Sequence, residues 1–175
     1  MILYVMRHAD AGKFRGNPLL DSKRALTKEG KDQCMLMARA LNALKVHPDV
    51  IVSSPLKRAA QSAQFVGTEL GYDTKVEISQ ALAPGASFLE FQAMMAAYAG
   101  RDSVLVVGHN PNMYRYLGQL IAGTAGPAIR MRKASIACVD MEHHPPRMQW
   151  LLDVRTVRGF YVSVTKSSRA KTSRK

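Results

Sequence analysis

The amino-acid sequence predicts a three-layer α/β sandwich, in which helices flank both faces of a mostly parallel central sheet. Short apolar runs rich in β-branched residues alternate along the chain with longer segments whose apolar residues recur at helical spacing. The last two apolar runs are separated only by the turn-like stretch EHHPPR, which is typical of a hairpin at one edge. The 175 residues include 47% hydrophobic and 22% charged side chains, a composition that suits one globular domain.

Each element of this sandwich has its own signal. The segments with strand composition are residues 2–6, 50–53, 75–78, 103–107, 135–141 and 148–154. The helix after the first strand is predicted from the spacing of Cys34, Met37, Ala38, Leu41 and Leu44. Thr27 is a suitable N-cap for this helix, and Glu29 in its first turn favours the helix dipole. Gly71 and Gly100 are predicted to end two further helices.

Much of the net charge of +12 lies near the C-terminus. From residue 154 onward the sequence has no acidic residue. The same segment has seven basic residues: Arg155, Arg158, Lys166, Arg169, Lys171, Arg174 and Lys175. We therefore predict a single domain over residues 1–165 and a basic, solvated tail over residues 166–175. Binding of this tail to nucleic acid or another polyanion is the alternative.

The sequence predicts a cytoplasmic protein with no membrane segment. Its longest apolar runs are far too short to span a bilayer, and the N-terminus enters a strand directly, without a signal peptide. Cys34 and Cys138 are far apart in the sequence and are predicted to be buried thiols, with a disulfide as the alternative. His143 and His144 are predicted to form an exposed polar turn rather than a metal site.

Basic side chains and histidines follow three of the predicted strands. Arg7 and His8 come directly after the first strand, in MRHADA, and His109 follows a later strand, in GHNPNM. The second strand runs into SSPLKRAAQSA, where Arg58 lies about one turn inside the next helix and can lean back toward its start. Because ligands bind at the carboxyl edge of the strands in an open α/β sheet, these four side chains are candidates for one site.

The surroundings of these residues predict an anionic ligand. Ser54 and Pro55 are interpreted as the cap and first residue of one helix, and Asn110 and Pro111 as those of another. Helix N-termini attract anions. Two guanidiniums that converge would repel one another unless they surround an anion, which they bind through paired hydrogen bonds. The predicted ligand is a phosphoryl group, although each of these residues taken alone is more often structural.

These stretches resemble those of the histidine phosphatase superfamily, the group that includes the phosphoglycerate mutases. The resemblance rests on RHA near the N-terminus, SSPLKRAAQSA after the second strand and VVGHNP late in the chain, and it covers about residues 1–154. The closer resemblance is to the small SixA-type phosphohistidine phosphatases, which share the MRHADA form and a pattern seen here as Asp21, Arg24, Leu26, Thr27 and Gly30. The resemblance implies a phosphoglycerate mutase-like fold.

The resemblance also implies a mechanism that needs no metal and no cofactor. His8 is the nucleophile that takes up the phosphoryl group, Arg7 and Arg58 hold its non-bridging oxygens, and His109 donates to the charge that develops on these oxygens. Water then hydrolyses phospho-His8. Reasoning from the residues agrees, because nearby guanidiniums should lower the pKa of His8 and keep its imidazole neutral and nucleophilic.

The sequence departs from the family pattern in two places. Ala9 stands where a glycine usually follows the nucleophile, so this turn should not need a positive φ. Larger members carry a glutamate as general acid in a region that reads QALAPGASFLEF here, where Ala83 and Pro84 are the best-aligned positions. Glu90 is the alternative acid, but we expect it on the next helix. A site without an acid favours phosphohistidine, whose imidazole can be protonated from solvent before it leaves.

The sequence therefore predicts a phosphatase that acts on a phosphohistidine-bearing partner protein, such as a phosphorelay component. Two alternatives remain: a small-molecule phosphomonoesterase, and a non-catalytic protein that binds phosphate or a polyanion. A monomer is the expected state, although no sequence feature bears on it directly.

Overall fold

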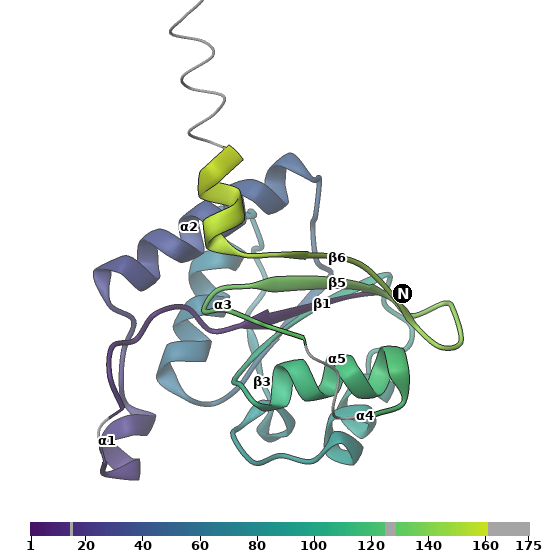
Figure 1. Ribbon diagram of the computed structural model, residues 1–175, viewed down its shortest axis with the longest axis horizontal. Helices are drawn as coiled ribbons and strands as arrows, with labels where there is room; N and C mark the ends of the chain where they lie inside the picture. The colour runs from purple at the N-terminus through teal and green to yellow at the C-terminus, as the bar shows by residue number, and fades with distance from the viewer. Residues whose placement is uncertain (15, 125–128, 161–175) are drawn as a thin grey trace, which may run out of the picture.

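The computed structural model describes residues 1–14, 16–124 and 129–160, and it contains one mixed sheet with helices on both faces (Figure 1). The predicted tail, residues 166–175, and its boundary at residue 165 lie outside these residues. The sheet has six strands in the order β3-β2-β4-β1-β5-β6. They are β1 (Ile2–Arg7), β2 (Val50–Ser53), β3 (Glu77–Ile78), β4 (Ser103–Gly108), β5 (Ile136–Asp140) and β6 (Arg147–Leu152).

The first four strands are parallel and the last two form an antiparallel hairpin at one edge, as predicted. β1 pairs in parallel with β4, and β4 and β3 each pair in parallel with β2. β5 runs antiparallel to β1 and to β6. The helical elements are α1 (Pro18–Ser22), α2 (Lys28–Ala43), α3 (Lys57–Glu69), η1 (Gln80–Leu82), α4 (Phe88–Ala96) and α5 (Asn112–Ala122).

The three predicted layers are present, because the strands bury both faces. Alternate side chains of β1 divide between two cores: Met6 packs with α2 and α3 on one face, and Leu3 and Val5 pack with α4 and α5 on the other. β1 leads to α2 on the first face, whereas its neighbour β4 leads to α5 on the second. The chain therefore diverges at the carboxyl ends of β1 and β4, where open α/β sheets bind ligands.

Several predicted helix ends are confirmed and others are wrong. The Thr27 side chain accepts a hydrogen bond from the Gly30 amide at 3.0 Å and caps α2, and Gly71 follows α3 with a φ of +72°. Ser54 and Pro55, however, precede α3, whose N-cap is Leu56. The N-cap of α5 is Pro111 rather than Asn110, and neither cap makes a side-chain hydrogen bond.

The last strand also ends earlier than predicted. β6 stops at Leu152 and residues 154–160 are helical, whereas we expected a strand over residues 148–154. The Asp153 side chain accepts a hydrogen bond from the Thr156 amide at 2.8 Å, which caps this helical turn. An Asp followed by an apolar residue is a helix-start signal that the apolar run obscured.

Gly30 is required by the close approach of α2 to the loop after β1. A Cβ atom at this position would lie 2.0 Å from the Asp10 carbonyl oxygen. We expect Gly30→Ala to destabilise the protein by about 1–3 kcal/mol or more, because backbone would have to move. That loss corresponds to a decrease in Tm of roughly 2–4 °C per kcal/mol. Gly100→Ala is the matched control, since nothing lies within 4 Å of its added Cβ; equal Tm values for the two variants would contradict this account.

Candidate active site

His8 and His109 lie side by side where β1 and β4 end. Arg7 and Gly108 are partners in the parallel register, and the His8 amide donates a hydrogen bond to the Gly108 carbonyl at 3.0 Å. The centroids of the two imidazole rings are 4.9 Å apart. The parallel pairing of two adjacent strands therefore brings together two histidines that are about a hundred residues apart in the sequence.

The His8 side chain is held in one orientation by its own backbone. Its Nδ1 lies 2.7 Å from the Ala9 carbonyl oxygen, which can only accept, so Nδ1 carries the proton and the lone pair is on Nε2. Burial lowers the pKa of His8 to about 4, and the charges of Arg58, Arg7 and Arg24 act in the same direction. The sequence predicted this direction from the guanidiniums alone, but burial is the larger cause.

Arg58 is buried and shares a carboxylate with a second arginine. Its Nη1 lies 3.1 Å from Asp21 Oδ2 and donates to the Asp21 carbonyl oxygen at 2.9 Å, while Arg24 Nε donates to Asp21 Oδ1 at 2.9 Å. Asp21 therefore compensates part of the charge that we expected to be uncompensated. The positive charges of Arg58, Arg24 and Arg7 all lower the pKa of His109, after the larger effects of burial and of His8.

Three buried donors around the two histidines have no hydrogen-bond partner among the described residues. They are Nε of Arg7, Nε of Arg58 and Nδ1 of His109. Arg7 is fixed by a hydrogen bond from its Nη1 to the Met131 carbonyl oxygen at 2.9 Å. An unpaired buried donor costs about 1–3 kcal/mol. Arg7 and Arg58 both act electrostatically on His8 and His109. Three such donors near the two imidazoles are chemically suited to an anion with several oxygen acceptors.

Ser54 sets the orientation of His109. The Ser54 hydroxyl lies 2.8 Å from His109 Nε2 and accepts a hydrogen bond from the Leu56 amide at 3.3 Å. The hydroxyl has one proton of its own, and when it donates this proton to Nε2 the proton of the neutral ring is on Nδ1. The nitrogen that lacks a protein partner is then a donor. Ser54 thus contacts His109, whereas the sequence analysis assigned it to the helix cap.

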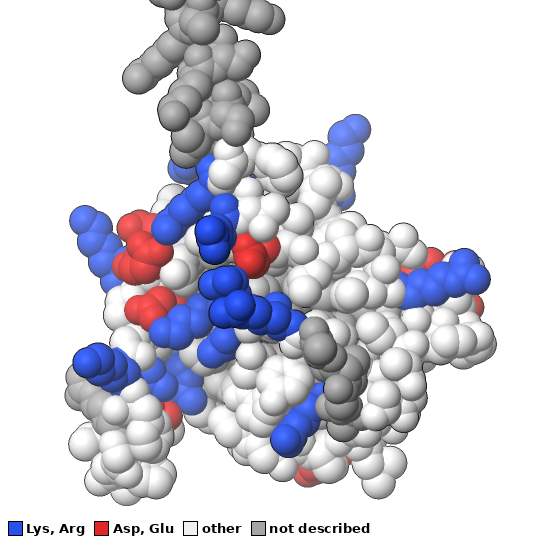
Figure 2. All heavy atoms as spheres, in the orientation of Figure 1, with Lys and Arg blue, Asp and Glu red and all other residues white. Residues whose placement is uncertain are grey.

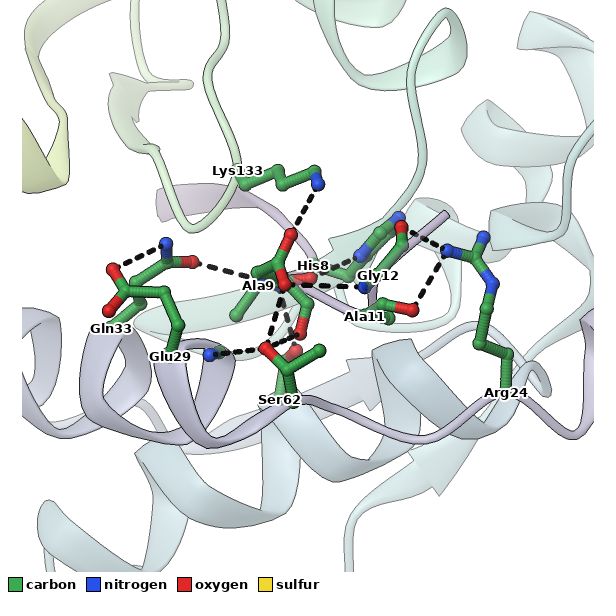
Figure 3. Close-up of polar contacts among 12 residues, drawn as sticks. His8, Ala9, Ala11, Gly12, Arg24, Glu29, Gln33, Ser62 and Lys133 are labelled. Carbon is green, nitrogen blue, oxygen red and sulfur yellow. Dashed lines mark hydrogen bonds and ion pairs between the residues drawn. The ribbon is translucent and has the colours of Figure 1, made fainter. Parts of the chain in front are cut away.

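The loop after His8 is anchored by side chains from three other segments (Figure 3). The Ala9 amide donates to Ser62 Oγ at 3.0 Å, and Arg24 Nη1 donates to the Ala11 and Gly12 carbonyl oxygens at 3.0 and 2.8 Å. Lys133 forms an ion pair with the Asp10 carboxylate. Ala9 does not have a positive φ, as predicted. These contacts fix the backbone that positions His8.

None of the residues considered for the general acid, Ala83, Pro84 and Glu90, is suited to donate a proton. Ala83 follows η1, and its carbonyl oxygen accepts a hydrogen bond from the Asn112 side chain at 3.0 Å. Glu90 lies in the first turn of α4, where it forms a capping box with Ser87. Hydrogen bonds from the Ser87 backbone and hydroxyl lower the pKa of this exposed carboxylate. Glu90 is therefore an ionised cap, whereas a general acid needs a raised pKa.

The structure brings all four predicted site residues to one edge and adds residues that the sequence analysis missed. Arg24 and Asp21 had been noted only as part of the family pattern, although their i, i+3 spacing is that of an ion pair on one helical turn. Ser54 could not be recognised, because its contact with His109 depends on the pairing of β2 with β4.

Three further findings concern the described residues only. Among them, no three His, Cys, Asp or Glu side chains are grouped so that they could hold a metal ion. None of the helices in the described ranges is both long and apolar enough to cross a membrane. Cys34 and Cys138 are buried thiols, as predicted, and form no disulfide.

The low pKa of His8 has a consequence for the pH dependence of any reaction in which its imidazole is the nucleophile. Because the pKa of about 4 lies below that of an ordinary histidine, the ring stays neutral down to mildly acidic pH. We expect kcat/KM for an aryl phosphate, corrected for ionisation of the substrate, to be retained down to about pH 5. A loss of activity that begins near pH 6.5, the ordinary value, would contradict this expectation.

Comparison with known proteins identifies the class to which this fold and site belong. Residues 3–83 match the model of the histidine phosphatase superfamily (branch 1). The chain is 33% identical over 144 residues to phosphohistidine phosphatase SixA of Escherichia coli K12, an alignment that covers 81% of this chain and 86% of that protein. It is also 34% identical over 139 residues to an uncharacterized protein of Picosynechococcus sp., covering 78% and 82% of the two chains.

A solved structure gives the same result. The protein histidine phosphatase SixA, in complex with tungstate, superposes with a TM-score of 0.78 at 29% identity, covering 87% of this chain and 97% of that chain. The chain belongs to the histidine phosphatase superfamily, and within it to the SixA-type branch. The predicted phosphoglycerate mutase-like sandwich is confirmed, and membership of this family supports a phosphatase.

Proposed function

We propose that this protein hydrolyses phosphohistidine on a partner protein through a covalent phospho-His8 intermediate, without a metal ion. The observation that carries the proposal is the set of three buried, unpaired donors on Arg7, Arg58 and His109. They belong to residues that act on the His8 imidazole through its charge or through ring contact, and this imidazole is neutral at pH 7 and has its lone pair on Nε2. The similarity to a phosphohistidine phosphatase supports the choice of substrate.

The proposed reaction has two steps at the phosphorus atom. The lone pair of His8 Nε2 attacks phosphorus, while the P–N bond of the substrate breaks and its electron pair stays with the substrate nitrogen. The substrate ring, protonated beforehand on its other nitrogen, leaves as neutral imidazole. Water then attacks the phosphoryl group, the bond to Nε2 breaks, and His8 regains its lone pair. Both protons of the water leave with inorganic phosphate.

The cationic side chains would stabilise the charge in both steps. Arg7 and Arg58 would donate to the non-bridging oxygens, and His109 Nδ1 would donate to a third acceptor. Because these groups neutralise the phosphoryl charge, no metal ion is part of the proposal. Asp21 would hold Arg58 and Arg24 in place through the ion pairs already described.

The free thiols of Cys34 and Cys138 support a reducing, cytoplasmic location.

Phosphate release from a synthetic histidine peptide, phosphorylated chemically with phosphoramidate, tests this function. We expect hydrolysis that is unaffected by a chelator and is inhibited competitively by tungstate, an oxyanion with which a related structure was solved. If the phosphohistidine peptide is not hydrolysed but alkyl phosphates are, the small-molecule phosphomonoesterase is favoured. Tight binding of phosphate without turnover of any phosphorylated compound would favour the non-catalytic binder.

A further inference from the structure

A basic groove opens beside Arg7. It has a volume of about 520 Å³, and the basic residues that line it are Arg7, Arg130, Arg132, Lys133, Arg155 and Arg158. The remaining lining residues carry no charge. Figure 2 shows Lys and Arg side chains gathered on this face of the molecule. Arg7 belongs both to the lining of the groove and to the candidate active site, so the groove borders the place where a phosphoryl group would be bound.

The fold assembles this groove from three separate segments. Arg7 ends β1, residues 130–133 precede β5, and Arg155 and Arg158 lie on the helical residues 154–160. In the sequence, these last two arginines stand among the basic residues near the C-terminus. The structure instead places them beside the active site, because the chain turns back into a helix after β6.

Half of the cations in the groove are paired and half are not. Arg132 lies 3.3 Å from an Asp153 oxygen, Lys133 pairs with Asp10, and Arg158 lies 2.7 Å from a Glu29 oxygen. Arg130 and Arg155 are exposed, and neither makes an ion pair with a carboxylate in the described ranges. Arg7 makes none there either, and its Nη1 bonds to a carbonyl group. The groove therefore has a net positive charge next to His8.

We infer that the basic groove binds carboxylate side chains that flank the phosphohistidine on the partner protein; this inference rests on the proposed function. A substrate histidine that reaches His8 brings its neighbouring residues over Arg7 and hence over the groove. Guanidinium groups bind carboxylates through paired, planar hydrogen bonds. Exposed arginines at the rim of an interface chiefly raise the rate of association with an oppositely charged partner.

The composition of the groove favours a protein over a nucleic acid. None of the described residues that line it is aromatic, whereas sites for single-stranded nucleic acid use aromatic side chains on which bases stack. Asp10, Glu29 and Asp153 lie among the cations and would repel successive backbone phosphates. A protein surface can place single carboxylates opposite the unpaired arginines and avoid these acidic groups.

Two synthetic phosphohistidine peptides test the inference: one has glutamates around the phosphohistidine and the other has glutamines at the same positions. We expect the wild-type protein to prefer the glutamate peptide by roughly tenfold in kcat/KM at low salt. This preference should disappear at ~0.5 M salt, where exposed charges are screened. It should also disappear in the double variant Arg130→Glu/Arg155→Glu, whose turnover of small phosphoramidate should be unchanged.

The matched control is Lys75→Glu/Arg101→Glu, which changes the charge equally at exposed positions that precede β3 and β4, toward the amino ends of the strands and away from the carboxyl ends where the site lies. It should keep the preference. Equal kcat/KM for the two peptides in the wild type would overturn the groove inference and leave the phosphohistidine function standing. No turnover of either peptide would overturn both. Binding of a fluorescent oligonucleotide that is lost in Arg130→Glu/Arg155→Glu, without any peptide preference, would assign the groove to nucleic acid instead.

Discussion

Replacement of His8 by alanine is expected to abolish hydrolysis of phosphohistidine, with a loss in kcat on the order of 10⁶-fold, because the nucleophile is removed. The donors that surround the phosphoryl group would remain, but no group in the site would form the covalent intermediate. The measurement is phosphate release from the phosphorylated peptide, in an assay sensitive enough to detect a single turnover per enzyme molecule.

Two further variants make this result interpretable. His8→Asn keeps an amide donor for the Ala9 carbonyl oxygen, so it tests whether any loss arises from the hydrogen bond rather than from the chemistry. His144→Ala removes an exposed histidine in the turn between β5 and β6 and should be fully active. Substantial activity in His8→Ala or His8→Asn, with Tm values close to that of the wild type, would show that the mechanism is not covalent catalysis by His8.

A preference for P–N over alkyl P–O substrates is the second large effect that we expect. Loss of a general acid costs about 10²–10⁴-fold when the leaving group must be protonated in the transition state. Alkoxides need this proton, whereas a phosphohistidine ring is protonated from solvent beforehand. We therefore expect kcat/KM for the phosphohistidine peptide to exceed that for the matched phosphoserine peptide and for an alkyl phosphate.

Glu90→Gln tests whether a hidden acid operates. Because Glu90 is an exposed carboxylate engaged in a capping box, we expect its replacement to leave all rates unchanged. The free energy of unfolding should fall only by part of what the cap of α4 contributes. Efficient hydrolysis of the alkyl ester by the wild type that collapses in Glu90→Gln would identify Glu90 as an acid. The assignment would then move to a general phosphomonoesterase.

The sequence predicted the layers, the hairpin at one edge of the sheet and the meeting of Arg7, His8, Arg58 and His109, because these depend on local periodicity and on parallel pairing. It did not predict the starts of α3 and α5. Ser54-Pro55 and Asn110-Pro111 have the residue types of a helix cap and first turn. In the structure, however, Ser54 and Asn110 lie in the strand-to-helix turns, two residues and one residue before the actual N-caps.

Contacts between distant segments could not be predicted from sequence patterns. The bond between Ser54 and His109 and the shared Asp21 carboxylate depend on tertiary packing. The role of Gly30 depends on the approach of α2 to the Asp10 carbonyl group, which no local signal encodes. For the same reason the pKa of His8 was predicted correctly in direction but attributed to charge, since its burial appears only when the sandwich is assembled.

The most direct test of the central claim is to trap the phosphorylated enzyme during turnover of a ³²P-labelled phosphohistidine peptide. Samples are quenched in alkali within single turnovers, digested and mapped by mass spectrometry. We expect label on His8 that forms and decays at least as fast as product is released, and no label on the enzyme in His8→Ala. Turnover without labelled His8, or label on another residue that is kinetically competent, would contradict it.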